Sequence, residues 1–333
     1  MKKILFLSLA LALSNAFALS LQEALAKVPQ TVSVKQARTE AADAKTNLER
    51  QLSDPLLTKP SELQARQRNE LAQLKLTASQ RTTEANVVSA YAQALEAQKQ
   101  VQIADKAQDL RELSLNIAQI RQRNGSGTAF DVKDAQNQLE DAKKNVVSAK
   151  DGLSTALRSL QIIIGNFDNK VVVPQAAQLP PMVDAKMTET VVNRSTTVAQ
   201  TRQGLEQAKQ QVALLDPSYS AQSQIDAAKT QADNAADSLD TAQDNERLSV
   251  TSLYNALVTA RTNLGVQEAA ENNAQDRLST DQKRLKSGLI SQLQLTQTEL
   301  STLQAELGLI QARNNYLKAY YSFLAGSAGA GGR

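Results

Sequence analysis

The chain contains no cysteine and no histidine among its 333 residues, and no tryptophan. Without cysteine it can form neither a disulfide nor a thiolate metal site, and it cannot carry a lipid on an N-terminal cysteine. Without histidine it lacks the commonest general base and the commonest metal ligand. No nucleophile–base set is evident, so we expect no catalytic residues, no cofactor and no metal site, and we do not expect an enzyme.

The chain also has little excess of positive over negative charge and few aromatic side chains. The formal net charge is +3 at pH 7, and aromatic residues make up 3% of the chain. A nearly balanced chain argues against a nucleic-acid binder, which would show a basic stripe. The low aromatic content argues against a thick globular core and against a membrane β-barrel with aromatic girdles. Abundant Ala, Gln, Leu, Thr and Ser instead favour long helices packed through narrow seams of small residues.

The N-terminus has the pattern of a secretion signal. Lys2 and Lys3 precede an apolar run over residues 4–13, and Ala16-Phe17-Ala18 gives a small-x-small cleavage site. About ten apolar residues are too few to cross a bilayer, which takes roughly 20. We therefore expect residues 1–18 to be a signal peptide and the chain to be exported.

The chain repeats its own pattern at an offset of about 163 residues, a spacing that indicates one structural unit used twice. Tyr91 corresponds to Tyr254, and Gly125 corresponds to Gly288. The repeats are expected over 19–165 and 186–326, joined by a Pro-containing linker at 166–185 and followed by a disordered tail at 327–333. Helices are expected over 31–51, 61–123, 128–164, 187–214, 221–286 and 291–324.

Breaks within each repeat come from proline and glycine. Asp54-Pro55 and Asp216-Pro217 interrupt the helical pattern at nearly equivalent points, because proline cannot continue a helix. The return helices carry heptad seams, from Ala135 to Ile163 and from Thr298 to Phe323, and the second has another apolar seam beside it. Such seams indicate coiled-coil hairpins. They fit either an ordinary antiparallel four-helix bundle or a closed α-barrel.

The two hairpin tips are the best-specified sites in the sequence. Gly125 and Gly288 can close a helix in the left-handed conformation, and Thr128 and Ser291 open capping boxes. These features also explain an ordinary helical turn, but Leu289 and Ile290, expected to be exposed, suggest a partner surface. The predicted tip residues are Gly125, Ser126, Gly127, Thr128, Gly288, Leu289, Ile290 and Ser291, flanked by the charges of Arg121, Arg123, Arg284 and Lys286.

The tip motifs resemble those of the outer-membrane efflux protein (TolC-like) family. The resemblance is carried by Arg121-x-x-x-Gly125 with Asp131-Val132-x-x-Ala135-Gln136, and by Arg284-x-x-x-Gly288-Leu-Ile-Ser291. The run Gln311-Ala312-Arg313-Asn314-Asn315-Tyr316 and the start at Leu19 are also similar. The resemblance implies a homotrimer that forms a periplasmic α-barrel and docks a periplasmic adaptor protein through its tips. It also implies that substrates pass through a tunnel, and that the protein lies in the periplasm or the outer-membrane-associated envelope.

The sequence departs from the family where the family inserts membrane β-strands. The two insertion points hold only residues 53–60 and 214–220, too few for strands of about 9–11 residues each. The expected fold is therefore all-α, two tandem repeats of long antiparallel coiled-coil hairpins in a trimeric α-barrel with no β-barrel, working with a separate outer-membrane protein.

Two functions remain open at this point: a conduit of an efflux or secretion system, and a structural spacer or tether of the cell envelope that carries no traffic. Asp131 and Asp281 are further candidates as carboxylates that narrow the tunnel end near the tips.

Overall fold

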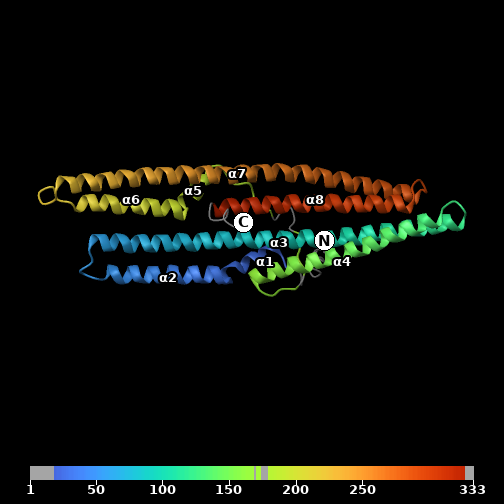
Figure 1. Cartoon of the computed structure of the whole chain (residues 1–333), viewed down its shortest axis with the longest axis horizontal. Coiled ribbons are helices and arrows are strands. Elements are labelled where there is room, and N and C mark those ends of the chain that lie inside the picture. The colour runs from blue at the N-terminus through green and yellow to red at the C-terminus, as the bar shows by residue number, and fades with distance from the viewer. Residues whose placement is uncertain (1–18, 169, 174–178, 327–333) are drawn as a thin grey trace, which may run out of the picture. The chain divides into compact units, whose positions relative to one another are not determined.

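The computed structural model describes residues 19–168, 170–173 and 179–326, and these residues are mostly helical (Figure 1). The elements are α1 (Leu21–Ala26), the 3-10 turn η1 (Val28–Gln30), α2 (Val32–Leu52), α3 (Lys59–Arg123), α4 (Ala129–Ile164), α5 (Met187–Asn193), α6 (Thr196–Leu214), α7 (Gln222–Lys286) and α8 (Gln292–Ala325). Across these ranges the β pairing is limited to one parallel bridge, between Leu19 and Val171. The expected all-α fold of long helical hairpins is confirmed.

Parts of the sequence-based expectations lie outside the described residues. The signal peptide at 1–18, the tail at 327–333 and the centre of the linker at 174–178 belong to this group. Within the described part of the chain, we find no helix with the length and apolarity needed to cross a membrane.

The two longest helices, α3 and α7, have 65 residues each. At 1.5 Å per residue each is roughly 97 Å long. Helix α3 begins two residues before the expected Ser61, because proline is tolerated in a first turn and Pro60 lies there. The hydroxyl of Thr58 accepts a hydrogen bond from the Ser61 N–H at 3.4 Å and so helps to close the helix start.

The expected single helix over 187–214 is wrong. The structure ends α5 at Asn193 and begins α6 at Thr196. Ser195 takes an extended conformation (φ −60°, ψ 127°), and its hydroxyl accepts a hydrogen bond from the Val198 N–H at 3.5 Å. Ser195 thereby acts as an N-cap, a position that serine favours over the helix interior.

This break makes the internal repeat more complete than the sequence pattern indicated. In the first repeat, α1 and η1 end at Thr31, the N-cap of α2, and in the second repeat α5 ends before Ser195, the N-cap of α6. Val28 and Val34 of the first copy are buried, as are Val192 and Val198 of the second. Both repeats therefore contain a short helix, a capped break, a medium helix, a long helix and a return helix.

The chain divides into two compact units, each built from segments of both repeats. Unit 1 holds residues 1–25, 87–179 and 260–317, and unit 2 holds residues 26–86, 180–259 and 318–333. The repeat boundaries expected from the sequence, with a linker at 166–185, stay a prediction about duplication in the chain.

Unit 1 is held by a core of α3, α4, α7 and α8 residues and by a tyrosine at its centre. Tyr91 is 1% exposed, and its hydroxyl lies 2.9 Å from the carbonyl oxygen of Leu19 and accepts a hydrogen bond from the Val172 N–H at 3.1 Å. Burial raises the pKa of Tyr91 well above its usual range. One side chain of α3 thus holds both the start of the described chain and the linker.

Polar contacts join α3 to α8 within unit 1. Asn314 is 1% exposed and donates to the carbonyl oxygen of Ala92 at 3.2 Å and to Glu96 at 2.8 Å. Lys99 pairs with Glu306. Because buried polar groups are costly unless they are hydrogen-bonded, these contacts favour one register of α8 on α3.

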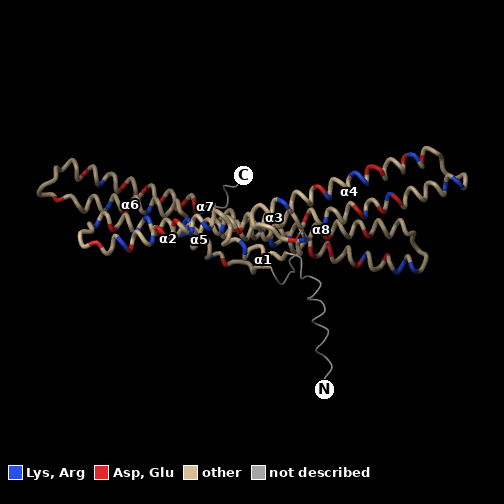
Figure 2. Tube along the Cα trace, turned by 90° about the horizontal axis from the view of Figure 1, so that it is seen from below, with Lys and Arg blue, Asp and Glu red and all other residues tan. Residues whose placement is uncertain are grey.

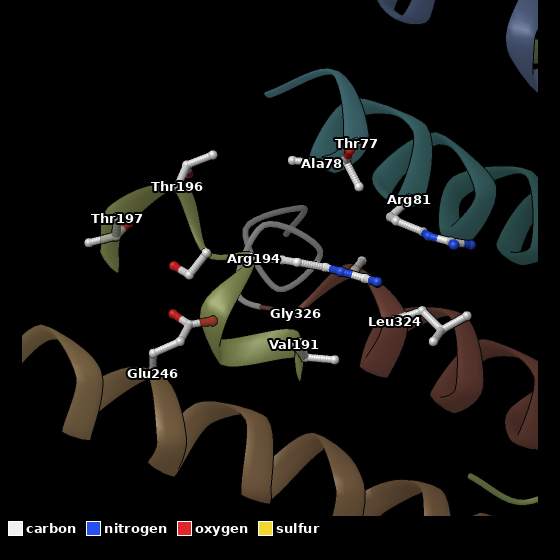
Figure 3. A pocket seen from close by; sticks show the side chains of 12 residues that line it. Thr77, Ala78, Arg81, Val191, Arg194, Thr196, Thr197, Glu246, Leu324 and Gly326 are labelled. Atoms are coloured by element: carbon white, nitrogen blue, oxygen red, sulfur yellow. The ribbon is translucent and has the colours of Figure 1, made fainter. Parts of the chain in front are cut away.

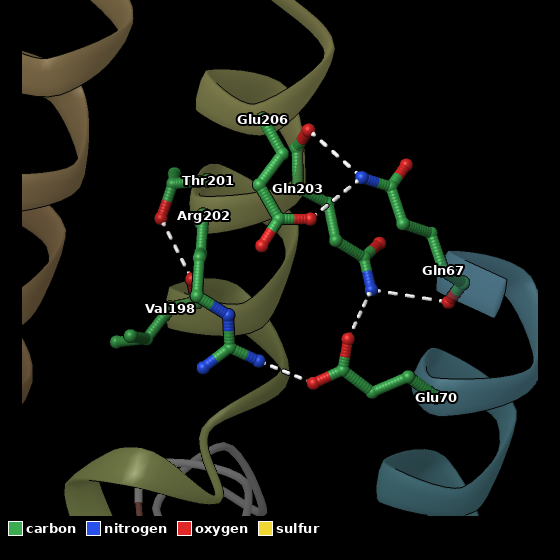
Figure 4. A network of polar contacts seen from close by, with 7 residues as sticks. All are labelled: Gln67, Glu70, Val198, Thr201, Arg202, Gln203 and Glu206. Atoms are coloured by element: carbon green, nitrogen blue, oxygen red, sulfur yellow. Dashed lines mark hydrogen bonds and ion pairs between the residues drawn. The ribbon is translucent and has the colours of Figure 1, made fainter. Parts of the chain in front are cut away.

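Unit 2 is organised around a polar network between α3 and α6 (Figure 4). Gln67 and Gln203 are buried and each donates to the other's backbone carbonyl oxygen, at 3.3 and 3.0 Å. Glu70 accepts from Gln203 at 3.1 Å and pairs with Arg202. Nearby, the rings of Tyr254 and Phe323 meet edge to face at 5.9 Å. The network aligns the helix pair α2–α3 with the pair α6–α7.

The expected heptad seams face the interior. Leu139, Ala142, Val146 and Leu160 of α4 are buried, as are Thr298, Thr302, Ala312, Tyr316 and Phe323 of α8. The second seam of α8 is only partly covered, because Leu300, Leu303 and Leu307 are half-buried. The single chain therefore leaves apolar surface on α8 available to a further neighbour.

Candidate functional site

The candidate site comprises the two hairpin tips, tip 1 (residues 124–128) between α3 and α4 and tip 2 (residues 287–291) between α7 and α8. Both tips belong to unit 1, and Figure 1 shows them at the same end of that unit. Figure 2 shows Lys and Arg interspersed with Asp and Glu along the helices. Next to the turns themselves the charges are mostly cationic, with Arg121 and Arg123 before tip 1 and Lys283, Arg284 and Lys286 before tip 2.

Both tips begin with the same helix ending. The N–H of Ser126 donates to the carbonyl oxygen of Arg121 at 2.9 Å, and the N–H of Gly125 donates to that of Gln122 at 3.1 Å. In tip 2 the N–H groups of Leu289 and Gly288 make the corresponding bonds to Arg284 and Leu285, both at 2.9 Å. This is the Schellman motif, which requires a left-handed residue.

Glycine occupies that left-handed position in both tips. The φ angles are +71° at Gly125 and +72° at Gly288. A Cβ at either position would meet no atom within 4 Å, so the constraint comes from the backbone conformation and not from space.

Both return helices begin with the predicted capping box. Thr128 accepts from the N–H of Asp131 at 3.1 Å, and Asp131 accepts from the N–H of Thr128 at 2.8 Å. In tip 2, Ser291 accepts from the N–H of Gln294 at 3.2 Å, and Gln294 accepts from the N–H of Ser291 at 3.0 Å. Each tip is therefore fixed at both ends by local hydrogen bonds, which gives a turn of defined shape.

The four flanking cations are exposed and differ in their contacts. Arg284 pairs with Asp281 at 3.2 Å, and Arg123 donates to the carbonyl oxygen of Gln119 at 3.4 Å. Arg121 lies close enough to Asp131 to contribute to lowering its pKa, although the hydrogen bonds from the Thr128 N–H and hydroxyl contribute more. Arg121, Arg123 and Lys286 present positive charge at the negative ends of α3 and α7.

The apolar residues of the tips differ from the sequence-based expectation in two ways. Leu289 is 70% exposed, as expected, but Ile290 is half-buried and so does not present a free side chain. Phe130, which the sequence reasoning did not select, is 76% exposed on the first turn of α4. The sequence offered one indication of this exposure: Phe130 is an aromatic residue two positions after the N-cap Thr128, in the first turn of the helix next to the hairpin tip.

A cavity of about 330 Å³ lies beside tip 1. It is lined by Ser114, Ile117, Ala118 and Arg121 of α3, by Ser126 and Gly127 of the tip, by Asp131 of α4 and by Leu293 of α8. Leu293 comes from the other hairpin, so the start of α8 contributes to a cavity that is otherwise formed by tip 1 and its helices. The cavity combines a guanidinium group, a carboxylate, a hydroxyl and apolar walls.

The two candidate constriction residues lie in different surroundings. Asp131 is exposed and belongs to the capping box of tip 1. Asp281 is buried, accepts a hydrogen bond from Thr298 at 2.8 Å and pairs with Arg284. Within the single chain both carboxylates therefore have structural partners, and their role at a tunnel end stays a prediction.

A second cavity, of about 190 Å³, lies in unit 2 where the break between α5 and α6 faces the end of α8 (Figure 3). Its polar lining includes Arg81, Arg194, Ser195 and Glu246. Arg81 pairs with Glu84 at 2.8 Å, and Ser195 caps α6. Arg194 and Ser195 lie at the helix break and Arg81 is paired within α3, so we assign the cavity a structural role.

Comparison with known proteins gives the family of the chain. The model of the family described as "Outer membrane efflux protein" matches residues 61–166 and 215–325, which together are more than half of the chain. No curated protein sequence matches the chain.

Solved structures share the fold at low sequence identity. A membrane protein from Pseudomonas aeruginosa matches with a TM-score of 0.64 at 14% identity, over 92% of each chain. The CmeC outer membrane channel of Campylobacter jejuni matches with a TM-score of 0.63 at 12% identity, over 93% of this chain and 86% of that one. The MtrE outer membrane channel of Neisseria gonorrhoeae, in its open state, gives 0.59 at 14%, over 92% and 89%. On the family match, and with the duplicated hairpin fold in agreement, the chain belongs to the outer membrane efflux protein family.

Proposed function

We propose that the chain is a periplasmic conduit component of an efflux or secretion system and that it docks an adaptor protein through its two hairpin tips. The observation that carries the proposal is a pair of rigid tips in unit 1, with a cavity beside tip 1 and with Phe130 and Leu289 exposed. Family membership supports the transport role, because outer membrane efflux proteins act as channels and not as enzymes.

The shape of the tips supports docking to a protein and not to a small ligand. Tip 1 and tip 2 each have both helix ends closed by hydrogen bonds. Preorganised turns lose little conformational entropy on binding, and exposed apolar side chains surrounded by polar groups are typical of binding surfaces. An adaptor that offers a helical hairpin of its own could place an apolar residue in the 330 Å³ cavity.

Exposed side chains on the helix flanks support assembly into a homotrimer. Val147 and Ile162 of α4 are 59% and 78% exposed, and Leu248 of α7 is 71% exposed. With the half-buried second seam of α8, they supply apolar surface that a neighbouring copy of the chain would cover. In this proposal the chain is exported to the periplasmic side of the outer membrane and works with a separate outer-membrane protein.

Site-specific photocrosslinking from the tips tests the docking. A photoreactive residue at Leu289 or Phe130 in producing cells is expected to crosslink to a periplasmic adaptor, and Leu289→Asp together with Phe130→Asp is expected to abolish efflux. The matched control is Val32→Asp, a similarly exposed apolar position in unit 2. Adaptor crosslinking that persists in the double variant would refute the tip interface. Adaptor binding without any substrate efflux would favour the spacer or tether.

A further inference from the structure

Two loops of unit 2 have the same Asp-Pro turn, and the proposed transport function assigns no role to either loop. We call them the apex turns: residues 53–58 between α2 and α3, and residues 215–221 between α6 and α7. The Asp54 carboxylate accepts from the Leu56 N–H at 2.9 Å, and the Asp216 carboxylate accepts from the Ser218 N–H at 2.7 Å. Proline follows each aspartate and fixes its own φ. Each turn is therefore a rigid Asx turn, built twice.

Each apex turn presents a large apolar side chain to the outside. Tyr219 is 91% exposed and Leu56 is 85% exposed, the two highest values among the large hydrophobic residues that the structure describes. Leu214 and Leu52, at the helix ends below them, are 61% and 44% exposed. The hydrogen bonds of each turn fix the backbone from which these side chains project.

The polar network of α3 and α6 places both apex turns at the same end of unit 2 (Figures 1 and 4). Gln67 lies eight residues after the start of α3, and its partner Gln203 lies eleven residues before the end of α6. At 1.5 Å per residue, the network is roughly 12 Å from one helix end and 17 Å from the other. Leu56 and Tyr219 can therefore reach one flat surface together.

The charge pattern around the apex turns fits a lipid surface. Asp54 is the only charged residue over 51–58, and Asp216 is the only one over 210–221. Both carboxylates are hydrogen-bonded in their turns. Arg50, Lys59 and Lys209 border the turns and are exposed, where long cationic side chains can reach phosphate groups while apolar neighbours enter the lipid.

The size of the apolar surface argues against a protein partner. A specific protein interface buries about 800 Å² on each side and draws on roughly 20–30 residues. The apex turns and the helix ends beside them offer four exposed apolar side chains, Leu52, Leu56, Leu214 and Tyr219. Shallow insertion into a bilayer needs only a few such side chains, and tyrosine and leucine suit the boundary between headgroups and acyl chains.

We propose that the apex turns anchor the chain to a phospholipid bilayer by inserting Leu56 and Tyr219 into the headgroup–acyl boundary. The anchor would hold the chain at a membrane through loops and not through a spanning segment. The proposal does not depend on adaptor docking, because it concerns unit 2 alone.

Fluorescence labelling tests the insertion directly. Because the chain has no cysteine, a single introduced cysteine can carry an environment-sensitive dye. The chain with Leu56→Cys or Tyr219→Cys is mixed with vesicles of phosphatidylethanolamine and phosphatidylglycerol, and Val32→Cys, 72% exposed at the other end of α2, serves as the control. A blue shift at the two apex positions and none at Val32 is expected. No shift at the apex, or an equal shift at all three positions, would overturn the proposal.

Vesicle co-sedimentation gives the second readout. The double variant Leu56→Asp, Tyr219→Asp is expected to lower the apparent vesicle affinity at least about tenfold, since each side chain loses apolar burial. Leu289→Asp, a tip change, is expected to sediment as the parent does, which separates this proposal from adaptor docking. Circular dichroism checks that the variants stay folded. Unchanged sedimentation of the double variant would refute the lipid anchor. A blue shift of the dye at the apex positions that grows with protein concentration in the absence of vesicles would also refute it.

Discussion

At the residue scale, the tip glycines are set by backbone conformation. Gly125 and Gly288 have φ near +70° with free space around a hypothetical Cβ. A substitution there therefore costs only the left-handed conformation, which is disfavoured for residues with a side chain.

Gly125→Ala is expected to lower the free energy of unfolding by about 1–2 kcal/mol. The matched control is Gly152→Ala, which also has no atom within 4 Å of the new Cβ but lies inside α4. The control is expected to raise stability by about 0.5–1 kcal/mol, because alanine is the better helix former. Urea denaturation of both variants measures the change in the free energy of unfolding. If both changes had the same sign, the left-handed role of Gly125 would be contradicted.

Asp131 makes the cap of tip 1 sensitive to acid. Hydrogen bonds from the Thr128 N–H and hydroxyl lower the pKa of Asp131 from its ordinary value of 3.8. The cap therefore contributes its stability in full above pH 3.8 and loses it as the pH falls through the lower pKa of the folded state. Tip 2 supplies an internal control, because Gln294 occupies the same position and does not titrate.

Amide hydrogen exchange followed by NMR or mass spectrometry checks this difference. Protection at residues 128–131 is expected to hold at pH 5 and to fall below pH 3.8, while protection at residues 291–294 does not follow that titration. Asp131→Ala is expected to remove the pH dependence from tip 1. Parallel loss at both tips would point to general acid unfolding instead.

At the element scale, the side chains between α3 and α6 select one alignment of the two helices. Gln67 and Gln203 bond each other's carbonyl oxygens from positions that are 4% and 7% exposed. A shift of either helix by one residue would leave these amides buried without partners, which costs more than the bonds themselves contribute. The network thus specifies register as well as adding stability.

Gln203→Ala is expected to lower the stability of unit 2 by about 1–3 kcal/mol, because Glu70 and the Gln67 carbonyl oxygen each lose a donor. Gln200→Ala on the exposed face of α6 is the control and is expected to change stability little. Thermal unfolding followed by circular dichroism compares them. A Gln203 variant as stable as the control would show that the network is incidental.

At the scale of the whole molecule, the proposed self-assembly rests on apolar side chains that the single chain leaves exposed. Ile162, Leu248 and the partly covered seam of α8 lie on helix flanks and not at tips or turns. If each chain contacts the next through the same pair of flanks, the assembly closes into a ring when the rotation from one chain to the next is a whole fraction of a full turn.

Light scattering of the mature chain without detergent is expected to give three times the monomer mass. Ile162→Lys with Leu248→Lys is expected to shift the mass toward the monomer, since each lysine would be buried without a partner in the trimer. Leu289→Asp at tip 2 is expected to leave the mass unchanged. A parent protein that is monomeric at every concentration would refute self-assembly without partners and favour a barrel that forms only on its adaptor.

Local physics explains how much of the fold could be read from the chain. Proline cannot continue a helix, so the chain breaks near Pro55 and Pro217. Glycine at Gly125 and Gly288 supplies a conformation other residues avoid, and a Ser or Thr followed three residues later by Asp or Gln caps a helix. These effects act within a few residues, so the sequence alone determined the long helices, the hairpin tips and the duplicated plan.

Only the tertiary structure decided which side chains are covered. It ended α5 before Ser195, left Ile290 half-buried, exposed Phe130 and turned Asp281 toward Thr298. It also made Tyr91 bind two segments that lie 72 and 81 residues away in the chain. Burial depends on partners distant in sequence, and a helical period shows only that a face is apolar. Packing alone determines what covers that face, and so which residues remain free to bind.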